Sequence, residues 1–460
     1  MTEDWADLLR ELATEEDIPG AALAVWTDGR LSVAAHGVLN AATGVAATPE
    51  SLFQIGSITK LWTATMIMQL IDEGRLSLDT TVARALPGVR LGAGDGDGAG
   101  GAEAEITVRH LLTHTSGIDG DIFADTGRGA DCGERYAAGL AGAAQIFSPG
   151  AAYSYCNSGF VLLGRIIEVL DGREWDESLR ERLIRPLGLT RTFTLPEEAI
   201  AHRVATGHRE YPHHDQPVSV WGLPRSLGPA GNIVASAADV LAFARMHLDG
   251  GLSPDGTRLL SAAAVAAMQP AQIELPSLGD RADAVGLAWR LNRWSGGRVI
   301  GHDGGTIGQS AFMRADPRSG VVACLLTNSP EADGLFRRLF AEIFGECAGT
   351  TMPAGPEPVI GRPGADLRWH EGRYERVSRR HDVSVRDGRL HVVSSMTGDR
   401  AALGDDTGGE EFDLFPADGS GDAFLGRLRD DQAWNTLIFG RLADATRYMY
   451  VGGRITPRVG

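Results

Sequence analysis

The chain of 460 residues has a single lysine, Lys60, and all of its other basic side chains are arginine. Arginine keeps its proton near neutral pH, whereas a lysine that is removed from water can lose its proton. A composition that accepts arginine everywhere else therefore indicates that Lys60 occupies a position where a removable proton is needed. The alternative is that lysine was lost by drift and that the last one happened to remain here.

Other features are also scarce. The formal net charge is −17, which argues against nucleic acid and an anionic membrane as partners. No uninterrupted apolar run approaches the roughly 18 residues of a membrane-spanning helix. The four cysteines are scattered without the paired spacing of metal ligands, so we expect free thiols and no metal site; they are Cys132, Cys156, Cys324 and Cys347.

The first twelve residues are acidic and amphipathic, with Trp5, Leu8, Leu9 and Leu12 on one helical face. They lack the basic region and the apolar region of a secretory signal, so we expect a cytoplasmic protein.

Length and periodicity predict two domains. The expected elements of the first domain are a hairpin over 21–35, a helix that begins at Ser57, helices over 160–189, 236–248 and 331–345, and two or three strands over about 285–328. Because strands lie at both ends of this segment, we predict one α/β (α+β) domain over residues 1–350, with a central antiparallel sheet and a helical region.

Residues 351–365 are rich in proline and glycine and are typical of a linker. Past them, short alternating runs around Asp-Gly turns predict seven or eight strands, and therefore a small antiparallel barrel or sandwich over residues 366–460. Residues 92–105 are of low complexity, and we expect a surface loop there.

Ser57 and Lys60 are three residues apart where a helix is expected, so their side chains return to one face. A serine hydroxyl is a weak nucleophile until a base takes its proton. Burial lowers the pKa of a lysine and makes a neutral amine available as that base. We therefore predict that Ser57 is the nucleophile and Lys60 the base.

A second element contains Tyr155 and Asn157. A phenol near a cationic lysine can have a depressed pKa and carry a proton to or from a leaving group. Asn157 would hold Lys60 and the substrate amide. The alternative is that both are turn residues before a helix; Tyr153 competes with Tyr155 but has no asparagine two residues on.

A third element reads Gly-His-Asp-Gly-Gly-Thr over residues 301–306. Glycines at 304 and 305 would let a substrate pair with the strand backbone. The amides of Gly305 and Ser57 would then hold an oxyanion. For His302 the alternative is a structural histidine of a hairpin.

With Ser-x-x-Lys, Tyr-x-Asn and His-x-Gly in this order, the chain resembles the class C β-lactamase and D-Ala-D-Ala carboxypeptidase (penicillin-binding-protein-like) superfamily of serine hydrolases. The resemblance covers about residues 10–345 and includes the segments 111–117, 155–164 and 228–231. It implies two-step acyl transfer without a metal or an organic cofactor, in which Tyr155 relays the proton while Asn157 and His302 position the reacting groups. It also makes a lipocalin-like barrel the expected C-terminal domain.

His302 stands where the β-lactamases have a lysine that grips the β-lactam carboxylate, so the resemblance favours D-aminopeptidase-like, esterase-like or acyl-transferring relatives. We expect a hydrolase or acyltransferase of a peptide-like amide, ester or thioester with a D-configured residue at the scissile bond. One alternative is a stand-alone penicillin-binding-protein-type thioesterase that macrocyclises a nonribosomal peptide delivered as a carrier-protein-bound thioester. Another is a sensor that traps an acyl group without turnover.

The short, proline-containing linker predicts that the C-terminal domain shapes the mouth of the active site. Arg441 and Arg447 lie in or near the last expected strands and would meet a substrate carboxylate bidentately. The alternative is that both are solvated surface arginines.

Lys60→Arg should be nearly as inactive as Lys60→Ala, because a permanently charged guanidinium cannot act as a base. We expect kcat/KM for an activated ester to fall by about a hundredfold or more in both variants. Near-native activity of the arginine variant would show that Lys60 only contributes a charge.

Overall fold

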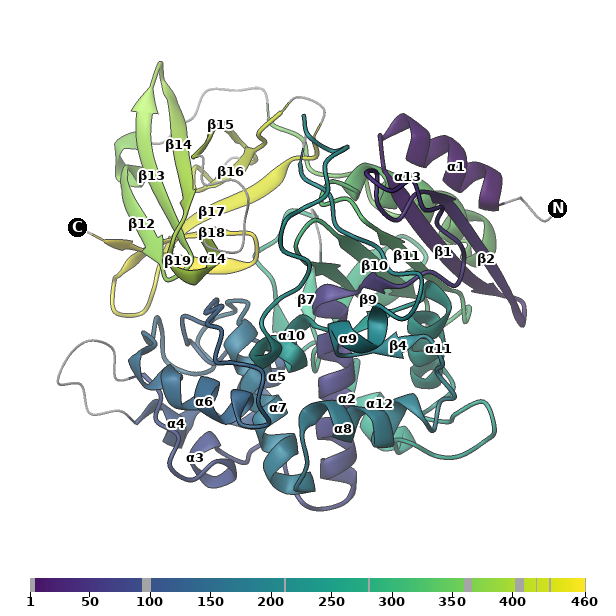
Figure 1. Cartoon of the computed structure of the whole chain (residues 1–460). Helices are drawn as coiled ribbons and strands as arrows, with labels where there is room; N and C mark the ends of the chain where they lie inside the picture. The colour runs from purple at the N-terminus through teal and green to yellow at the C-terminus, as the bar shows by residue number, and fades with distance from the viewer. Residues whose placement is uncertain are drawn as a thin grey trace.

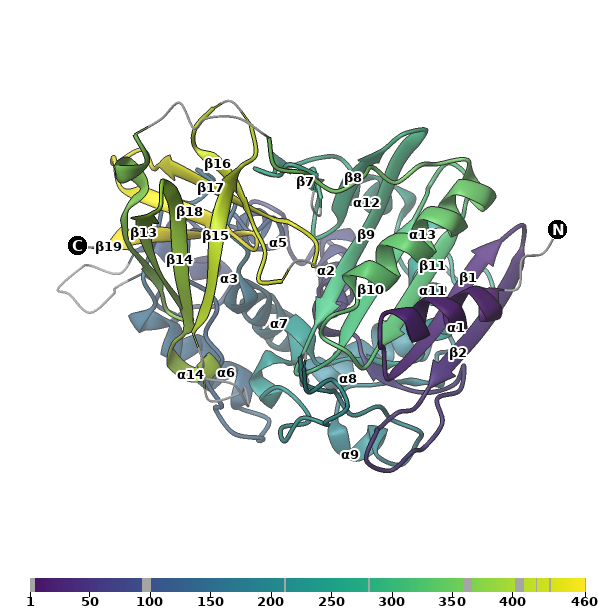
Figure 2. The ribbon, with the colours of Figure 1, turned by 90° about the horizontal axis from the view of Figure 1, so that it is seen from above.

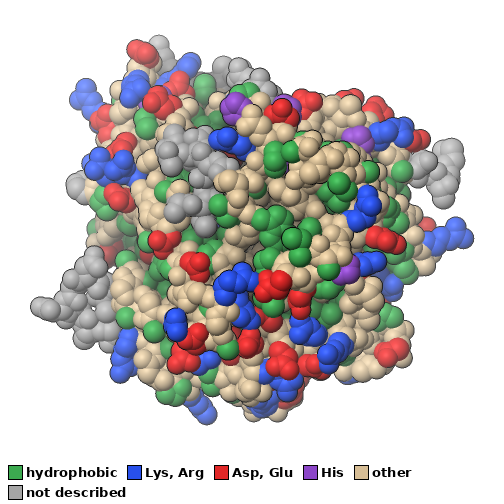
Figure 3. All heavy atoms as spheres, viewed as in Figure 1, with side chains coloured by type: hydrophobic (Ala, Val, Ile, Leu, Met, Phe, Trp, Pro, Cys, Tyr) green, Lys and Arg blue, Asp and Glu red, His purple; other side chains and the backbone are tan. Residues whose placement is uncertain are grey.

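The computed structural model describes residues 5–92, 101–210, 212–279, 282–359, 366–401, 409–418, 420–429 and 432–459. A domain of sheet and helices lies beside a barrel that ends the chain (Figure 1). Acidic and basic side chains are interspersed over the face shown in Figure 3, so this face presents no continuous surface of one charge. No helix within the described ranges has the length and apolar character needed to cross a bilayer.

An antiparallel sheet of eight strands forms the centre of the first domain, in the order β2-β1-β11-β10-β9-β8-β7-β6. Its strands are β1 (Gly20–Thr27), β2 (Arg30–Gly37), β6 (Ile273–Glu274), β7 (Ala284–Val285), β8 (Arg290–Trp294), β9 (Gly297–Gly305), β10 (Ser310–Ala315) and β11 (Val322–Thr327). β1 pairs with β11, so the sheet joins the two ends of the domain. The predicted α/β fold with a central antiparallel sheet is confirmed.

The region from about 285 to 328 contains more than the two or three strands expected. β10 and β11 are buried at every position, so they lack the alternation of polar and apolar residues by which a strand is recognised. β7 has only two residues, too few for any period.

Helices cover both faces of the sheet. α1 and α13 lie side by side on one face (Figure 2), where Leu9 and Phe340 are fully buried. α11 packs against β1 and β11, and the rings of Trp62 in α2 and Phe243 in α11 stack with their centroids 4.1 Å apart. The helices of this domain are α1 (Trp5–Glu15), α2 (Thr59–Asp72), α3 (Val82–Ala85), α4 (Ala102–Glu105), α5 (Val108–Leu112), α6 (Cys132–Gly139), α7 (Asn157–Asp171), α8 (Trp175–Leu179), α9 (Pro196–Ala199), α10 (Gly228–Gly231), α11 (Ala237–Leu248), α12 (Ala262–Met268) and α13 (Asp333–Ala348).

Two sequence-based expectations need adjustment in this region. The helix expected over 160–189 is divided, because α7 ends at Gly172 in the left-handed conformation (φ 67°), after which α8 and a π-helical turn follow. In the segment 92–105, residues 93–100 lie outside the described residues, and α4 occupies the end of the segment.

A small sheet of β3 (Phe53–Gln54), β5 (Val234–Ala235) and β4 (Thr192–Phe193) leads into the turn that carries Ser57.

The second domain is a closed barrel of eight antiparallel strands in sequence order, as the alternating runs predicted. Its strands are β12 (Gly372–Arg376), β13 (Arg379–Arg386), β14 (Arg389–Met396), β15 (Glu410–Pro416), β16 (Ala423–Gly426), β17 (Asn435–Arg441), β18 (Arg447–Val451) and β19 (Arg454–Val459), with the helix α14 (Gly398–Ala401) after β14. Tyr374, Phe424, Phe439 and Met449 fill its core. In the expected linker, residues 351–359 form no helix and no strand apart from an isolated bridge at Thr351. Residues 360–365 lie outside the described residues.

The barrel is docked against the loop that precedes α7. The amide of Tyr155 donates to the carbonyl of Gly453 at 2.9 Å, and the amide of Ile455 donates to Ser154 Oγ at 3.1 Å. Tyr153, Tyr155 and Ile455 share one hydrophobic cluster. The C-terminal domain is therefore held against the first domain beside Tyr155.

The end of β9 lies against the turn that carries Ser57. A Cβ on Gly304 would lie 1.9 Å from the carbonyl oxygen of Ile55. Gly56 has a φ of 52°, and a Cβ there would lie 2.7 Å from the amide nitrogen of Gly305. The two backbones approach this closely only because these positions are glycine.

Gly304→Ala should therefore lower the melting temperature by several degrees, because its methyl group would push against a backbone rather than a flexible side chain, and overpacking of this kind costs about 1–3 kcal/mol. Gly305→Ala is the matched control, since nothing lies within 4 Å of its added Cβ. Calorimetry of both variants checks the prediction, and equal melting temperatures would contradict the close approach.

Candidate active site

Ser57 and Lys60 lie together at the start of α2. Ser57 is in a short 3-10 turn, Gly56–Ile58, that runs directly into α2, and Lys60 is the second residue of the helix. Lys60 is fully buried, and its Nζ lies 3.1 Å from Ser57 Oγ. The spacing of three residues thus brings the predicted nucleophile and the predicted base into contact.

The other partners of Lys60 are both acceptors. Nζ donates to Asn157 Oδ1 at 2.7 Å and to the carbonyl of Ala230, in α10, at 2.6 Å. A neutral amine has two hydrogens and one lone pair. When the two hydrogens go to these oxygens, the lone pair is left for the hydroxyl hydrogen of Ser57, which is the arrangement a general base requires.

The surroundings favour this neutral form. Burial lowers the pKa of Lys60 well below its usual value, and the nearby guanidinium groups of Arg454 and Arg290 act in the same direction. The carboxylate of Asp121 opposes them.

Tyr155 lies between Lys60 and the barrel. Its ring centroid is 4.9 Å from Lys60 Nζ and 4.7 Å from the guanidinium carbon of Arg454. Burial raises the pKa of Tyr155 to about 12, although Arg290, the Ser57 hydroxyl and Arg454 act in the opposite direction. The expected depression of this pKa is therefore wrong, because the loss of water outweighs the cations, and Tyr155 is a protonated phenol at neutral pH.

His114, which belongs to the segment 111–117 of the resemblance, supports Tyr155 from behind. The His114 ring stacks on the Tyr155 ring with centroids 4.2 Å apart, and its Nδ1 accepts a hydrogen bond from the amide of Cys156 at 3.0 Å. Burial lowers the pKa of His114 well below its usual value, so the ring stays neutral. His114 holds the loop of Tyr155 in place and does not reach the cavity.

Asn157, the first residue of α7, links Lys60 to an acidic residue. Its Oδ1 accepts from Lys60 as described, and its Nδ2 donates to Asp121 Oδ1 at 2.7 Å. Asp121 is 2% exposed and also binds two arginines of the barrel, Arg376 and Arg454. Neither Asp121 nor Arg454 was singled out from the sequence, because no local pattern connects them to Lys60.

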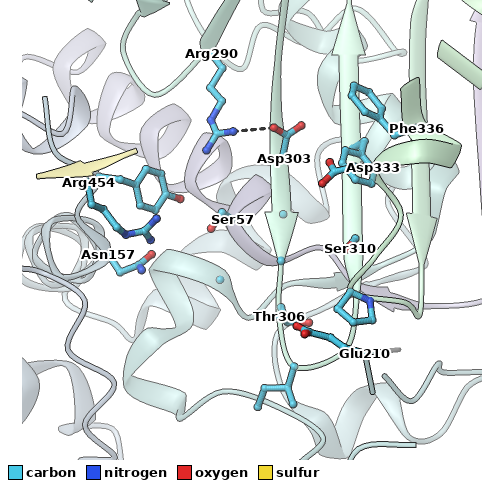
Figure 4. Close-up of a pocket in the computed structure, with 18 of the residues that line it drawn as sticks. Ser57, Asn157, Glu210, Arg290, Asp303, Thr306, Ser310, Asp333, Phe336 and Arg454 are labelled. Atoms are coloured by element: carbon cyan, nitrogen blue, oxygen red, sulfur yellow. Dashed lines mark hydrogen bonds and ion pairs between the residues drawn. The ribbon is translucent and has the colours of Figure 1, made fainter. Parts of the chain in front are cut away.

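His302 lies in β9, behind the cavity wall. Its Nδ1 is 2.6 Å from the carbonyl oxygen of Asp303, so Nδ1 carries the hydrogen in the neutral ring. Burial, Arg290 and Lys60 lower the pKa of His302 well below its usual value. His302 therefore does not replace the positive charge of a lysine at this position. Arg290 and Arg314 are the cations here, and both pair with Asp303, at 2.7 and 2.6 Å (Figure 4 draws the Arg290 pair).

Ser57 opens into a cavity of about 780 Å³ between the two domains. Asn157 and Arg454 lie on one side of Ser57, and Asp303 and Asp333 lie on the other (Figure 4). The first domain also contributes Tyr155, Gly304 and Gly305. The barrel contributes Arg379, Met396, Arg400, Glu410, Leu428 and Arg454.

Arg441 and Arg447 do not line this cavity. Both lie over the ring of Trp369 within the barrel, and Arg447 donates to the carbonyl of Trp369 at 3.1 Å. The geometry thus does not support their predicted contact with a substrate carboxylate, and the arginines of the second domain that line the cavity are Arg379, Arg400 and Arg454. The docking of the barrel turns the start of β19, not the end of β17 or the start of β18, toward Ser57.

Comparisons with known proteins agree with this fold. A family model described as Beta-lactamase matches residues 5–345. Penicillin-binding protein 4 of Amycolatopsis lactamdurans is 47% identical over 378 residues, which are 80% of this chain and 97% of that protein.

Two solved structures extend the comparison. The crystal structure of SurE matches with a TM-score of 0.75 and 29% identity over 99% of this chain and 98% of that chain, and SurE with D-Leu matches with 0.74 and 30% over the same shares. The D-stereospecific amidohydrolase from Streptomyces sp. matches with a TM-score of 0.56 and 26% identity over 75% of this chain and 99% of that chain. Because the family model covers most of the chain and the Amycolatopsis protein is similar over nearly its whole length, this chain belongs to the β-lactamase family of penicillin-binding-protein-like serine hydrolases.

Proposed function

We propose that the chain is a serine acyl-enzyme hydrolase or acyltransferase that acts on a peptide-like amide, ester or thioester with a D-configured residue at the scissile bond. The contact between the buried Lys60 Nζ and Ser57 Oγ at 3.1 Å, beside a large cavity, is the observation that carries this proposal. The D configuration is supported by the two relatives that are named with it, the SurE complex with D-Leu and the D-stereospecific amidohydrolase.

In the first step, Ser57 Oγ attacks the carbonyl carbon while Lys60 Nζ takes the hydroxyl proton. The negative charge that forms on the carbonyl oxygen faces the amides of Ser57 and Gly305. As the bond to the leaving group breaks, Tyr155 gives its phenolic proton to that group and recovers one from the Lys60 ammonium. The high pKa of Tyr155 suits a residue that must be protonated when the leaving group departs.

In the second step, water or an amine attacks the acyl-serine, and the same groups move the proton in reverse order. Asn157 keeps Lys60 in place throughout, through the hydrogen bond to its Oδ1. His302, in β9 behind the cavity wall, stays neutral and fixes the strand end through the carbonyl of Asp303.

Aminolysis is the second candidate outcome, including closure of a peptide on its own amino terminus. The cavity of about 780 Å³ lies in the upper part of the range of ligand pockets, about 300–1,000 Å³, and has room for an acceptor beside the acyl group. The acyl donor would then be a peptidyl thioester, either free or bound to a carrier protein.

Ser57→Ala should form no acyl-enzyme and turn nothing over, because Ser57 is the hydroxyl that Lys60 contacts. Intact-mass measurement after incubation with a set of matched D- and L-peptidyl thioesters checks this. An adduct that persists on Ser57→Ala would overturn the assignment of the nucleophile.

The same set tests the stereochemistry and the fate of the acyl group. We expect the D-configured donors to be favoured in kcat/KM by about tenfold or more, a range within what pocket contacts provide. Equal rates for D and L donors would contradict the stereochemical part of the proposal. Product masses with and without an added amine separate hydrolysis from aminolysis, and a lasting adduct would indicate the trapping sensor.

A further inference from the structure

The barrel reaches the catalytic base through one carboxylate, that of Asp121. Arg454 in β19 donates from Nε to Asp121 Oδ2 at 2.6 Å and from Nη2 to Oδ1 at 3.2 Å. Arg376, at the end of β12, donates to Oδ2 at 2.8 Å. Asp121 belongs to the first domain, so two elements at opposite ends of the barrel sequence meet on a side chain that the barrel itself does not contain.

This contact is buried. The side chains of Asp121 and Arg376 are 1% and 7% exposed, and that of Arg454 is 19% exposed. Burial works against the charge of Asp121, but Arg454 and Arg376 outweigh it and hold the pKa of this carboxyl well below its usual range. Asp121 is therefore ionised near neutral pH.

An ionised carboxylate fixes the orientation of Asn157. It has no hydrogen to donate, so the end of the Asn157 amide that faces Asp121 must be Nδ2. The opposite end, Oδ1, then faces Lys60 and accepts its hydrogen. Without this carboxylate, nothing described in the structure would keep the amide from turning its NH₂ toward the amine.

The charge of Arg454 also matters directly. Asp121 alone would stabilise the ammonium form of Lys60, and Arg454 counteracts it, with Arg290 acting in the same direction from β8. The other titratable groups around Lys60 are neutral, because burial moves the pKa of each one in the direction that favours its uncharged form; they are Tyr155, Cys156, His114 and His302. Arg454 is thus a cation of the barrel that opposes the effect of Asp121 on Lys60.

We propose that Asp121, Arg454 and Arg376 are positioning residues through which the docked barrel sets the charge state and orientation of the Lys60 amine. The barrel would then influence the proton affinity of Lys60 in addition to forming one wall of the cavity. The inference deepens the proposed function and depends on it only where a rate is measured. It predicts opposite effects for the two signs of charge, which a purely structural role would not produce.

The single lysine allows a direct test without any substrate. Protein grown with [ε-¹³C]lysine gives one side-chain signal, that of Lys60, whose chemical shift reports its titration. Arg454→Gln should raise the titration midpoint by about one pH unit or more, because a cation beside the amine is lost. Asp121→Asn should lower it by a similar amount, because the anion is lost.

The rate provides the second readout. Loss of the proton from Lys60 activates the base, so kcat/KM for a small activated ester rises with pH through the pKa of Lys60. Arg454→Gln should move this rise to higher pH, and at a pH below the rise the rate should fall about tenfold for each pH unit by which the rise moves. Arg454→Lys keeps the charge and should restore most of the wild-type profile. Arg441→Gln is the control, since Arg441 lies on the same barrel against Trp369, away from the cavity.

Circular dichroism and melting curves establish that each variant is folded, and Arg376→Gln replaces Arg454→Gln if the latter is not. Unmoved titration midpoints in folded variants, or midpoints that move in the same direction for Arg454→Gln and Asp121→Asn, would overturn the inference. If the midpoints move as expected but the wild-type protein forms no acyl-enzyme with any ester or thioester, the inference stands and the proposed function fails.

Discussion

The burial of one amine is the constraint on which the rest of this structure depends. Lys60 is fully inside the protein, and a charged ammonium there would be costly. Its three neighbours, Ser57 Oγ, Asn157 Oδ1 and the carbonyl of Ala230, match the two hydrogens and the lone pair of a neutral amine. Each neighbour comes from a different segment. The hydrogen bonds of the Lys60 amine therefore depend on how α7 and α10 pack against α2 and the turn before it.

The charge around the cavity differs from the charge of the whole chain, because several arginines line it. The chain as a whole carries a net charge of −17, yet arginines surround the cavity, among them Arg290, Arg314, Arg400 and Arg454. Two of them pair with Asp303 and one with Asp121, while the base, the phenol and the nearby histidines stay neutral. Carboxylates such as Asp303, Asp333 and Glu410 also line the cavity, so the neutral centre lies among charges of both signs.

The two domains differ in what they supply. The sheet and helices hold the proposed reacting groups, and the close approach of β9 to the Ser57 turn through Gly56 and Gly304 gives a strand edge beside Ser57. The barrel supplies Arg454 and Arg376 on Asp121 and a wall of the cavity. The agreement with SurE over 99% of this chain shows that this pairing of domains is shared with that protein.

Features that depend on local geometry could be predicted from the sequence alone. The spacing of three residues predicts that Lys60 lies beside Ser57, and alternating runs around Asp-Gly turns predict the barrel. Tyr155 lies just before α7, and Asn157 is its first residue. That Arg454, rather than Arg441 or Arg447, faces Ser57 could not be predicted, because it depends on how the barrel is docked. Asp121 and Arg454 lie 333 residues apart, and no periodicity connects them. The pKa of Tyr155 is raised because the residue is buried. Burial depends on the whole fold and could not be predicted from the neighbouring residues of the sequence.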